Sequence, residues 1–442
     1  MKAGYNPDES SKYIMYWDLN NLYGWAMMKY LPFSGFRWVQ NVNQIDFLAV
    51  PDDSPVGYIL EVDIHYPESI HDDHKHIPFC PEHMAPPGSK QKKLMTTLLD
   101  KSCYVIHYVA LKQAVKHGLI VTKTHRVLQF NQSDWLKTYI DLNTELRAKA
   151  TNPLQKALYK LKNNSIYGKT MENQRKHKNI RLITQWSGRY GAEAYISRPN
   201  FKNYTIFDEE FAAVEVLRTS VTIEKPIYIG LCVLDICKTL LYRYHYEVIK
   251  PKFGDNAKPM YMDTDSIVYE ISNFDVYKFM KDNLEEFDTS DYPVDNQYDI
   301  PRVNQKVPGL MKDEANGKII AKFVGLRSKL YSILFDDEST IKKAKGVKSC
   351  VVKKTIEFED YEKCLKEDST VCREQLNIRS RKHQLYTEKC NKIALSARDD
   401  KRYLLKDSTD TLPWGHKDIY DLEMTQMDLD NFDEPPAKRA KL

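Results

Sequence analysis

Three short stretches, in a fixed order along the chain, decide the fold: Trp17-Asp18-Leu19-Asn20-Asn21-Leu22-Tyr23-Gly24, then KLKNNSIYGK at residues 160–169, then YMDTDS at residues 261–266. The run before Asp18 is β-prone, so we predict a strand that ends there. Residues 260–271 predict a hairpin with Asp263 and Asp265 at its tip. Carboxylates that meet in this way suit hard divalent cations, because Mg²⁺ takes oxygen ligands and shares them with substrate phosphates. The pattern is typical of phosphoryl transfer with two metal ions.

The second stretch belongs to a predicted helical hairpin. Helical spacing begins at Ser133, breaks at Asn152-Pro153 and resumes at Lys156. Lys156 and Lys160 are four residues apart, so they share one face of the helix and would neutralise the phosphates of a nucleoside triphosphate. A DxD hairpin by itself also occurs in glycosyl-transfer sites, and a helix face with lysines is often only solvated. The inference of phosphoryl transfer therefore depends on the order of the three stretches.

Composition and charge narrow the class of protein. The chain has 442 residues, 42% of them hydrophobic, and a net charge of +4. It has no apolar run near the ~18 residues of a membrane span, and charges within residues 1–12 argue against a secretory signal. Eight cysteines are too few for a disulfide scaffold, which indicates an intracellular protein with reduced thiols.

Basic residues are concentrated in two segments. Residues 147–181 contain ten Lys/Arg against one acid, and residues 302–354 contain thirteen against five. Residues 406–434 reverse the balance, with nine acids against two lysines. The basic segments fit a sequence-independent hold on nucleic-acid phosphates.

The three stretches resemble regions A, B and C of the family B DNA polymerases, most of all the protein-primed branch found in linear viral genomes, linear plasmids and self-synthesising transposons. That family has D-x-x-S-L-Y-P, K-x-x-x-N-S-x-Y-G and Y-x-D-T-D-S. The second and third patterns match in full, whereas Asn21 and Gly24 stand where region A has Ser and Pro. Lys329-Leu330-Tyr331 also fits the family's K-x-Y motif, and the resemblance extends over about residues 12–405.

The resemblance implies an α+β right-hand polymerase core, with an antiparallel palm sheet, helical fingers and a small thumb. The expected parts are residues 1–65 (palm, with region A), 66–132 (insertion at the terminal-protein-binding position), 133–170 (fingers, with region B), 171–225 (second insertion), 226–335 (palm, with region C and K-x-Y), 336–405 (thumb) and 406–442 (acidic tail with a nuclear localisation signal).

The resemblance also implies roles for single residues. Asp18, the Leu19 carbonyl and Asp265 would hold two Mg²⁺ ions, which Mn²⁺ can replace, and Asp263 would support the hairpin beside them. The nucleotide-binding residues would be Leu19, Tyr23 (excluding a 2′-hydroxyl), Arg147, Lys156, Lys160, Asn164 and Tyr167. The DNA-binding residues would be Gly168, Lys329, Tyr331, Lys343, Lys345 and Lys348.

The expected partners are a DNA primer-template, dNTPs and, through the branch resemblance, a terminal protein primer. Only 17 residues precede Asp18, so we expect no proofreading exonuclease in this chain, which is then a fragment or a degenerate transposon-derived copy. The last eight residues, PPAKRAKL at 435–442, resemble a nuclear localisation signal and predict a nuclear import receptor as a further partner. We expect no membrane partner.

Two other functions remain open. A reverse transcriptase or RNA polymerase usually has adjacent aspartates in the third motif, and Asp263-Thr264-Asp265 argues against it. A catalytically inactive, transposon-derived nucleic-acid-binding remnant is the second alternative, and the intact Asp18, Asp265, Lys160 and Lys329 argue against it.

Weaker patterns yield further expectations. Cys80-x-x-His83 and Cys103-x-x-x-His107 have spacings that resemble zinc sites, but their flanks favour a loop and a helix, so we do not predict zinc. We expect a helix over residues 94–116, a solvated loop at His71–His76 and no structure after Ser408.

Overall fold

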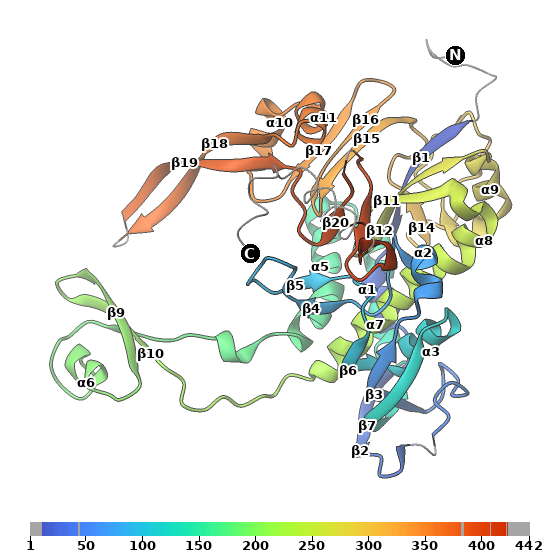
Figure 1. The fold of residues 1–442 in the computed structure, drawn as a ribbon. Helices are drawn as coiled ribbons and strands as arrows, with labels where there is room; N and C mark the ends of the chain where they lie inside the picture. The colour runs from blue at the N-terminus through green and yellow to red at the C-terminus, as the bar shows by residue number, and fades with distance from the viewer. Residues whose placement is uncertain (1–10, 43–44, 382–383, 407, 421, 423–442) are drawn as a thin grey trace, which may run out of the picture.

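The computed structural model describes residues 11–42, 45–381, 384–406, 408–420 and 422. It has a mixed α+β fold in which several small sheets surround one long central helix (Figure 1). Within these residues, no helix is both long and apolar enough to cross a bilayer.

A five-stranded sheet carries the first and third sequence motifs. Its strand order is β11-β12-β1-β14-β13. The strands are β1 (Lys12–Leu19), β11 (Ala257–Asp263), β12 (Ser266–Ser272), β13 (Phe287–Asp288) and β14 (Met311–Asp313). The predicted strand before Asp18 and the predicted hairpin around Asp263 and Asp265 are both confirmed.

Strand β1 is sandwiched between two layers because its side chains alternate. Met15, Trp17 and Leu19 are almost fully buried in the main core. Ile14 and Tyr16 face the other way and pack against a smaller sheet that contains Tyr331. Asp18 shares the face of Ile14 and Tyr16, so it emerges between the two layers at the end of the strand.

A four-stranded antiparallel sheet with the order β2-β7-β3-β6 lies below the first sheet in the view of Figure 1. Its strands are β2 (Leu31–Trp38), β3 (Val56–His65), β6 (Lys101–His107) and β7 (Ile120–Ser133), and it joins residues on both sides of the expected boundary at residue 65.

The prediction of a helix over residues 94–116 is wrong for the first half of that range. Residues 101–107 form β6, and only α3 (Tyr108–Lys116) is helical, because a short apolar run suits a buried strand as well as a helix.

The helical hairpin forms as expected from the break at Asn152-Pro153. Helices α4 (Lys137–Lys149) and α5 (Pro153–Thr170) pack together, and the Asn152 Oδ1 accepts a hydrogen bond from the Gln155 amide at 2.8 Å. Pro153 occupies the first helical position, where no intrahelical donor is lost.

The long central helix α7 (Ile227–Arg243) continues as a π-helical turn, η4 (Tyr244–Ile249). It packs against α5, α3 and α1 (Leu22–Met27), so it joins the first two motifs to the rest of the core. The remaining helices are α2 (His71–His74), α6 (Ala192–Ile196), α8 (Lys250–Phe253), α9 (Val276–Asp282), α10 (Ser349–Thr355) and α11 (Phe358–Lys366), with 3₁₀ turns at Glu68–Ile70, Gln174–Lys176, Gly254–Asn256 and Leu284–Glu286.

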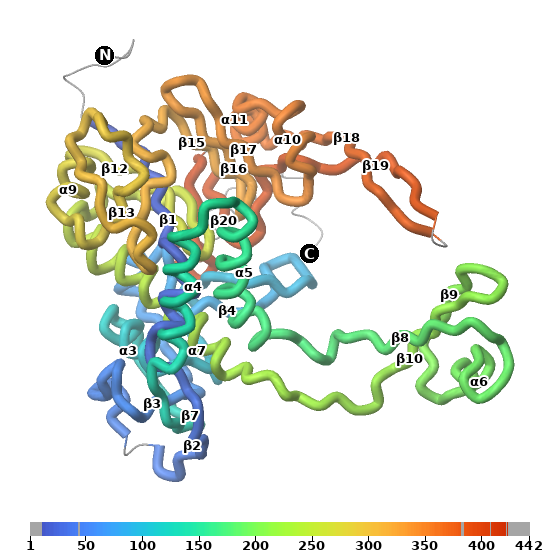
Figure 2. The backbone as a smooth tube through the Cα atoms, turned by 180° about the vertical axis from the view of Figure 1, so that it is seen from behind, coloured from blue at the N-terminus to red at the C-terminus, as the bar shows by residue number. Residues whose placement is uncertain are grey.

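Two units project from the body on the same side, as Figures 1 and 2 both show. The first combines α6 with the sheet β8-β10-β9 and is joined to the body by two extended chains. The second is a long hairpin beyond α10 and α11, which pack on the sheet β15-β16-β17. The strands are β8 (Asn179–Ile183), β9 (Phe201–Asp208), β10 (Phe211–Val216), β15 (Ile320–Arg327), β16 (Leu330–Phe335), β17 (Thr340–Ala344), β18 (Thr370–Arg381) and β19 (Gln384–Ser396).

Two expectations about loops are wrong. His71 and His74 are buried rather than solvated, and burial lowers the pKa of His74 to about 3. The expected lack of structure after Ser408 is wrong for residues 408–420, where the His71 ring accepts a hydrogen bond from the Lys417 amide at 3.0 Å. Residues 421 and 423–442 lie outside the described part of the chain. The small strand pairs are β4 (Glu82–Met84) with β5 (Lys93–Met95), and β20 (Arg402–Leu404) with β21 (Thr411–Pro413).

Replacing Gly309 tests how tightly the loop after Asp18 is held. Gly309 has φ +84° and donates to the Asn20 carbonyl at 2.7 Å, and a Cβ there would lie 2.3 Å from Trp25 Cδ1. We expect Gly309→Ala to lower the free energy of unfolding by about 2–4 kcal/mol, from positive φ plus overpacking. Gly88→Ala is the control, with φ +73° but nothing within 4 Å of its Cβ, and should cost only about 1–2 kcal/mol. Equal losses in denaturant titrations would contradict the clash.

Candidate active site

The end of β1 and the tip of the β11–β12 hairpin meet through the backbone. The Leu19 amide donates to the Asp265 carbonyl at 2.7 Å, and Asp18 is paired with Ser266 across the two strands. On the other side, the Asn20 amide donates to the Leu310 carbonyl at 2.9 Å. Asp18 is thus fixed between a hairpin and a loop that lie hundreds of residues away in sequence.

Asp18 and Asp265 form a half-buried pair of carboxyl groups. Burial first, and then the charges of Asp265 and Glu314, raise the pKa of Asp18 to about 7. Burial and the charge of Asp263 also raise the pKa of Asp265. Because the charge of Asp265 disfavours ionisation of Asp18, the two acids need a cation to be ionised together.

Asp263 has a different environment from the other two acids. Its carboxylate lies 3.1 Å from the Lys329 ammonium. Thr264 has φ +43°, so the backbone turns sharply between the two acids and they do not share one strand face. The alternation rule of a regular strand therefore fails at this tip, as expected for a hairpin turn.

The K-x-Y motif is attached to the same hairpin by tyrosines. The Tyr261 hydroxyl accepts a hydrogen bond from the Lys329 amide at 3.0 Å, and its ring lies 4.8 Å from that of Tyr331. The Tyr331 hydroxyl lies 3.2 Å from the Tyr16 hydroxyl. The Tyr261 hydroxyl thus fixes the Lys329 backbone beside the hairpin, and the buried Tyr331 packs against the Tyr261 ring.

Helix α5 adds the second motif to this site. Tyr167 stacks on Tyr23 from α1, with ring centroids 4.4 Å apart. Lys160 lies near enough to lower the pKa of both Asp18 and Asp265. Lys156 and Asn164 are exposed, and Gly168 has nothing within 4 Å of where a Cβ would stand, so this end of the helix is open to a ligand.

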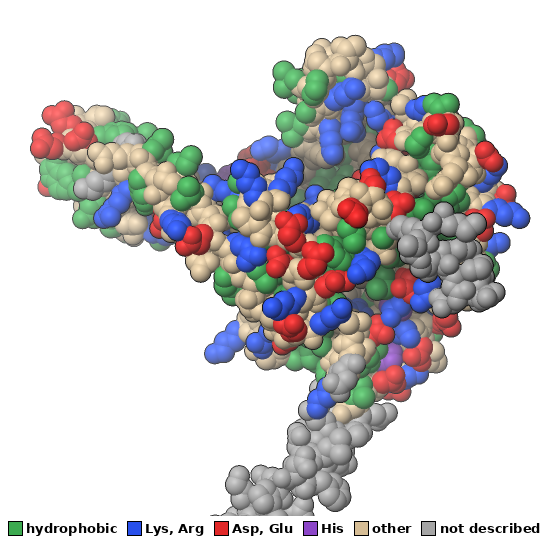
Figure 3. Space-filling model, turned by 90° about the horizontal axis from the view of Figure 1, so that it is seen from above, with side chains coloured by type: hydrophobic (Ala, Val, Ile, Leu, Met, Phe, Trp, Pro, Cys, Tyr) green, Lys and Arg blue, Asp and Glu red, His purple; other side chains and the backbone are tan. Residues whose placement is uncertain are grey.

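The remaining basic residues of the predicted site come from α4 and from the segment that begins at the end of β17. Arg147 is half-buried near the end of α4, and Lys343 and Lys345 are exposed at the end of β17. The Lys348 ammonium instead binds the Leu376 carbonyl on the projecting hairpin. Seen from above, Lys and Arg side chains gather round a hollow in the surface (Figure 3).

Sequence reasoning missed two charged neighbours of Asp18. Glu314 raises its pKa, and Lys312, which pairs with Asp18 across β1 and β14, lowers it. No local signal in the sequence places either residue beside Asp18; the pairing of β1 with β14 brings Lys312 there. Asn20 also binds Asp288, with Nδ2 donating to Oδ2 at 2.6 Å.

A model of the family described as "DNA polymerase type B, organellar and viral" matches residues 4–250, which is more than half of the chain. The chain belongs to this family. Among curated proteins, no sequence matches it. The predicted membership of the family B DNA polymerases is therefore confirmed. The Asp18–Asp265 pair, the lysines of α5 and the stack of Tyr23 on Tyr167 are thus features of a chain in this family.

Solved structures with a similar fold include Phi29 DNA polymerase. Its orthorhombic crystal form has a TM-score of 0.53 and 16% identity over 88% of this chain and 59% of that one. Its ternary complex with primer-template DNA and incoming nucleotide substrates has a TM-score of 0.55 and 17% identity, over 88% and 60%. The α+β fold thus resembles this polymerase, and the chain spans 59–60% of its length.

The raised pKa of Asp18 predicts a pH dependence of stability. In the metal-free chain Asp18 keeps its proton up to about pH 7, whereas the unfolded chain loses it near the ordinary value of 3.8. The folded state therefore binds more protons across this window, and its stability falls as pH rises through it. We expect Asp18→Asn to flatten the profile by about 1–2 kcal/mol after allowance for solvent screening, measured by urea unfolding in chelator.

The matched control is Asp282→Asn, which changes an exposed aspartate at the end of α9. It should leave the slope of stability against pH unchanged. A parallel profile for Asp18→Asn and the unmodified chain would show that Asp18 is ionised throughout and would refute the buried-pair description.

Proposed function

We propose that the chain is a DNA-directed DNA polymerase that adds dNTPs to a primer 3′-hydroxyl, in replication of a viral or transposon genome. The observation that carries this proposal is the junction of Asp18 and Asp265, two half-buried acids of raised pKa fixed by the 2.7 Å bond between Leu19 and Asp265. Membership of the DNA polymerase family supports the reaction, and the basic surface supports a nucleic-acid substrate.

The acid pair fits a divalent cation. Two carboxyl groups that repel each other's charge are a suitable oxygen donor set for Mg²⁺, and the Leu19 carbonyl is the proposed further ligand. Bound Mg²⁺ supplies Lewis-acid stabilisation of the attacking and leaving oxygens in phosphoryl transfer. Asp263 is neutralised by Lys329 at 3.1 Å, so in this proposal it orients the hairpin and the lysine rather than binding metal.

The other residues bind and orient the substrates. Lys160, with Lys156 and Arg147 as helpers, binds the triphosphate, and Tyr23 lies under the incoming sugar. Asn164, Tyr167 and Gly168 contact the nascent base pair. Lys329 and Tyr331 hold the primer end, while Lys343, Lys345 and Lys348 bind duplex phosphates, which positions DNA without reading its sequence.

These roles correspond to a right-hand arrangement. We assign the five-stranded sheet to the palm, α4 and α5 to the fingers, and the unit of α10, α11 and the β18–β19 hairpin to the thumb. Residues 66–132, which include β6 and most of β7, and the projecting α6 unit would be the two insertions. The first insertion is the proposed contact for a terminal protein primer.

We also propose a nuclear location, by binding of an import receptor to residues 435–442. These residues lie outside the described part of the chain, so the proposal rests on their sequence alone. A fluorescent protein carrying residues 435–442 should accumulate in nuclei, and the same fusion with Lys438 and Arg439 changed to Ala should not.

Primer extension tests the main proposal. The purified chain with a primed single-stranded template, dNTPs and Mg²⁺ should extend the primer, and Asp265→Ala should lower the rate by about 10²–10³-fold or more, because charge stabilisation at the reacting phosphate is lost. Asp282→Ala, an exposed acid away from the site, should retain the full rate. Omission of the divalent cation should abolish extension.

The outcome also separates the alternatives. Salt-sensitive DNA binding without extension would favour an inactive nucleic-acid-binding remnant. Extension with rNTPs on a DNA or RNA template, at a rate equal to that with dNTPs, would favour an RNA polymerase. Extension that survives Asp265→Ala would overturn the proposed site.

Tyr23 offers a test of sugar selection. We expect Tyr23→Val to raise rNTP incorporation relative to dNTP incorporation by about 10–100-fold, because the clash with the 2′-hydroxyl is removed. Tyr167→Val is the matched control, since it breaks the same 4.4 Å stack from the other side. It should weaken binding of both sugars equally. Equal selectivity in the two variants would rule out Tyr23 as the discriminating residue.

A further inference from the structure

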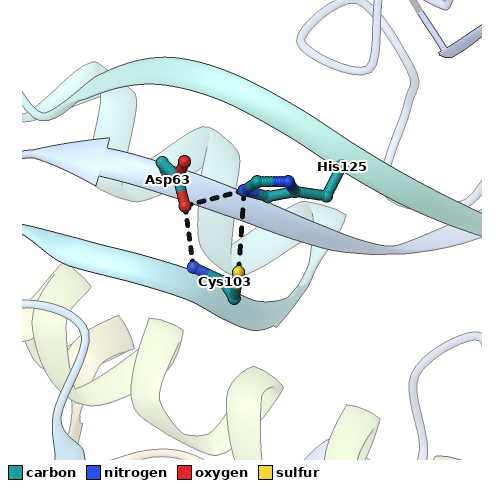
Figure 4. A group of neighbouring side chains, drawn as sticks. All are labelled: Asp63, Cys103 and His125. Atoms are coloured by element: carbon teal, nitrogen blue, oxygen red, sulfur yellow. Dashed lines mark hydrogen bonds and ion pairs between the residues drawn. The ribbon is translucent and has the colours of Figure 1, made fainter.

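Three potential metal ligands meet on adjacent strands of the four-stranded sheet, away from the acid pair. They are Asp63 on β3, Cys103 on β6 and His125 on β7, and their ligand atoms all lie within 4.8 Å of one another. Figure 4 shows the three side chains converging on one point from three strands. This point belongs to no part of the proposed polymerase mechanism.

Two irregularities in strand pairing create this convergence. Along β3 and β7, Glu61 pairs with Arg126 and Val62 with Thr124, so His125 is the extra residue of a β-bulge. Along β3 and β6, Val62 pairs with Tyr104 but Ile64 pairs with Lys101, so a second bulge contains Cys103. Bulges re-aim side chains, and here both flank Asp63.

The second bulge places a cysteine where glycine is usual. Cys103 has φ +50°, a left-handed conformation that costs about 1–2 kcal/mol in a residue with a Cβ. A glycine would avoid this cost in such a bulge. Backbone strain of this kind is often found at functional sites, so the presence of cysteine rather than glycine at residue 103 points to a role for its thiol.

The contacts organise the three groups around one nitrogen. His125 Nε2 lies 2.8 Å from Asp63 Oδ1 and 3.7 Å from Cys103 Sγ. The Cys103 amide also donates to Asp63 Oδ1 at 2.8 Å. These hydrogen bonds from the amide and from His125 lower the pKa of Asp63, so its carboxylate is ionised at neutral pH.

This geometry does not fit a nucleophilic Cys-His-Asp triad. In a triad the acid binds one ring nitrogen and the nucleophile the other. Here the acid and the thiol address the same nitrogen. Three different donors directed at a single point are instead the arrangement of a coordination sphere.

The distances suit Zn²⁺. Zinc bonds of about 2.3 Å to sulfur and 2.0–2.1 Å to nitrogen and oxygen imply tetrahedral edges of about 3.6 Å between S and N and about 3.3 Å between N and O. The observed S···N separation of 3.7 Å already has this length. The N···O separation of 2.8 Å would widen by about 0.5 Å as the metal replaces the shared proton.

We propose that Asp63, Cys103 and His125 form a zinc site that fastens β6 and β7 to β3. The thiol would release one proton to solvent, and the imidazole proton would move from Nε2 to Nδ1. Three protein bonds to Zn²⁺ would then replace bonds to water ligands, which leave to solvent. Cys103 is exposed, so the fourth position faces solvent and takes water. Sequence spacing had paired Cys103 with His107, whose ring is buried elsewhere, against Tyr108 and Phe130.

Cobalt and zinc titrations of the full chain test the proposal, with excess Mg²⁺ present to fill the acid pair. One Co²⁺ should bind with a thiolate-to-cobalt charge-transfer band and tetrahedral visible bands, and one Zn²⁺ should displace it. Zn²⁺ should raise the melting temperature, because it binds only the folded chain. Asp265→Ala should retain the band, so failure of the polymerase proposal leaves this test intact.

Cys103→Gly is the decisive variant, because glycine suits φ +50° and should fold at least as well as the unmodified chain. It should lose the charge-transfer band and the zinc-induced rise in melting temperature. His125→Gln should weaken zinc binding by at least about 10–100-fold. Cys350→Ser and His83→Gln, which change another exposed thiol and an exposed imidazole, should bind as the unmodified chain does.

Two results would overturn the site. One is a cobalt spectrum without a thiolate band in the unmodified chain. The other is a band that survives Cys103→Gly but disappears in Cys350→Ser, which would assign the metal to another thiol.

Discussion

The register between β1 and β12 is the constraint on which the acid site depends. Seven consecutive pairs, from Lys12 with Ser272 to Asp18 with Ser266, bring the strand end to the hairpin tip. A slip of one residue would turn Asp18 into the core and Trp17 outward, because side chains alternate along a strand. Burial of Trp17 therefore fixes the position of Asp18, and hydrophobic packing sets the geometry of an electrostatic site.

The site concentrates negative charge that the fold only partly compensates. Lys329 neutralises Asp263, and Lys312 and Lys160 act on Asp18 from a distance. Asp18 and Asp265 remain with raised pKa values, so folding here works against their ionisation. Such a pair is costly to keep unless a cation binds it, because like charges in a half-buried site disfavour each other. The folding free energy lost by bringing Asp18 and Asp265 together is consistent with a site selected for cation binding.

Local sequence predicted the elements that carry the motifs. The strand before Asp18, the acid-tipped hairpin and the helix break at Asn152-Pro153 each have strong local signals, and all three are confirmed. Residues 101–107 were predicted as helix because a short apolar run has no decisive period, and pairing with β3 makes them a strand. Burial of His71 could not be predicted either, since it depends on residues near 417 that return to cover it.

The sequence predicted which residues would come together in the candidate site, but not which of them would pair with one another. The motifs named Asp18, Asp265, Lys160 and Lys329, yet the ion pair between Asp263 and Lys329 and the approach of Glu314 arise from contacts between distant segments. Cys103 illustrates the same limit. Its neighbours in sequence suggested His107, whereas two bulges in a sheet direct it to His125 and Asp63.

The two proposed metal sites differ in chemistry because their sheets use different irregularities. A tight turn at Thr264 presents Asp265 beside Asp18 at the end of β1, which gives an all-oxygen donor set for a hard cation. Bulges within a sheet re-aim a thiol and an imidazole toward a carboxylate, which gives mixed donors for a borderline-soft cation. Helix α7 lies between the two sites, since it packs against β6 of the four-stranded sheet and against α1 beside the acid pair. A cation in the lower sheet would therefore stiffen the base on which α7 and the acid site rest, without sharing a ligand with it.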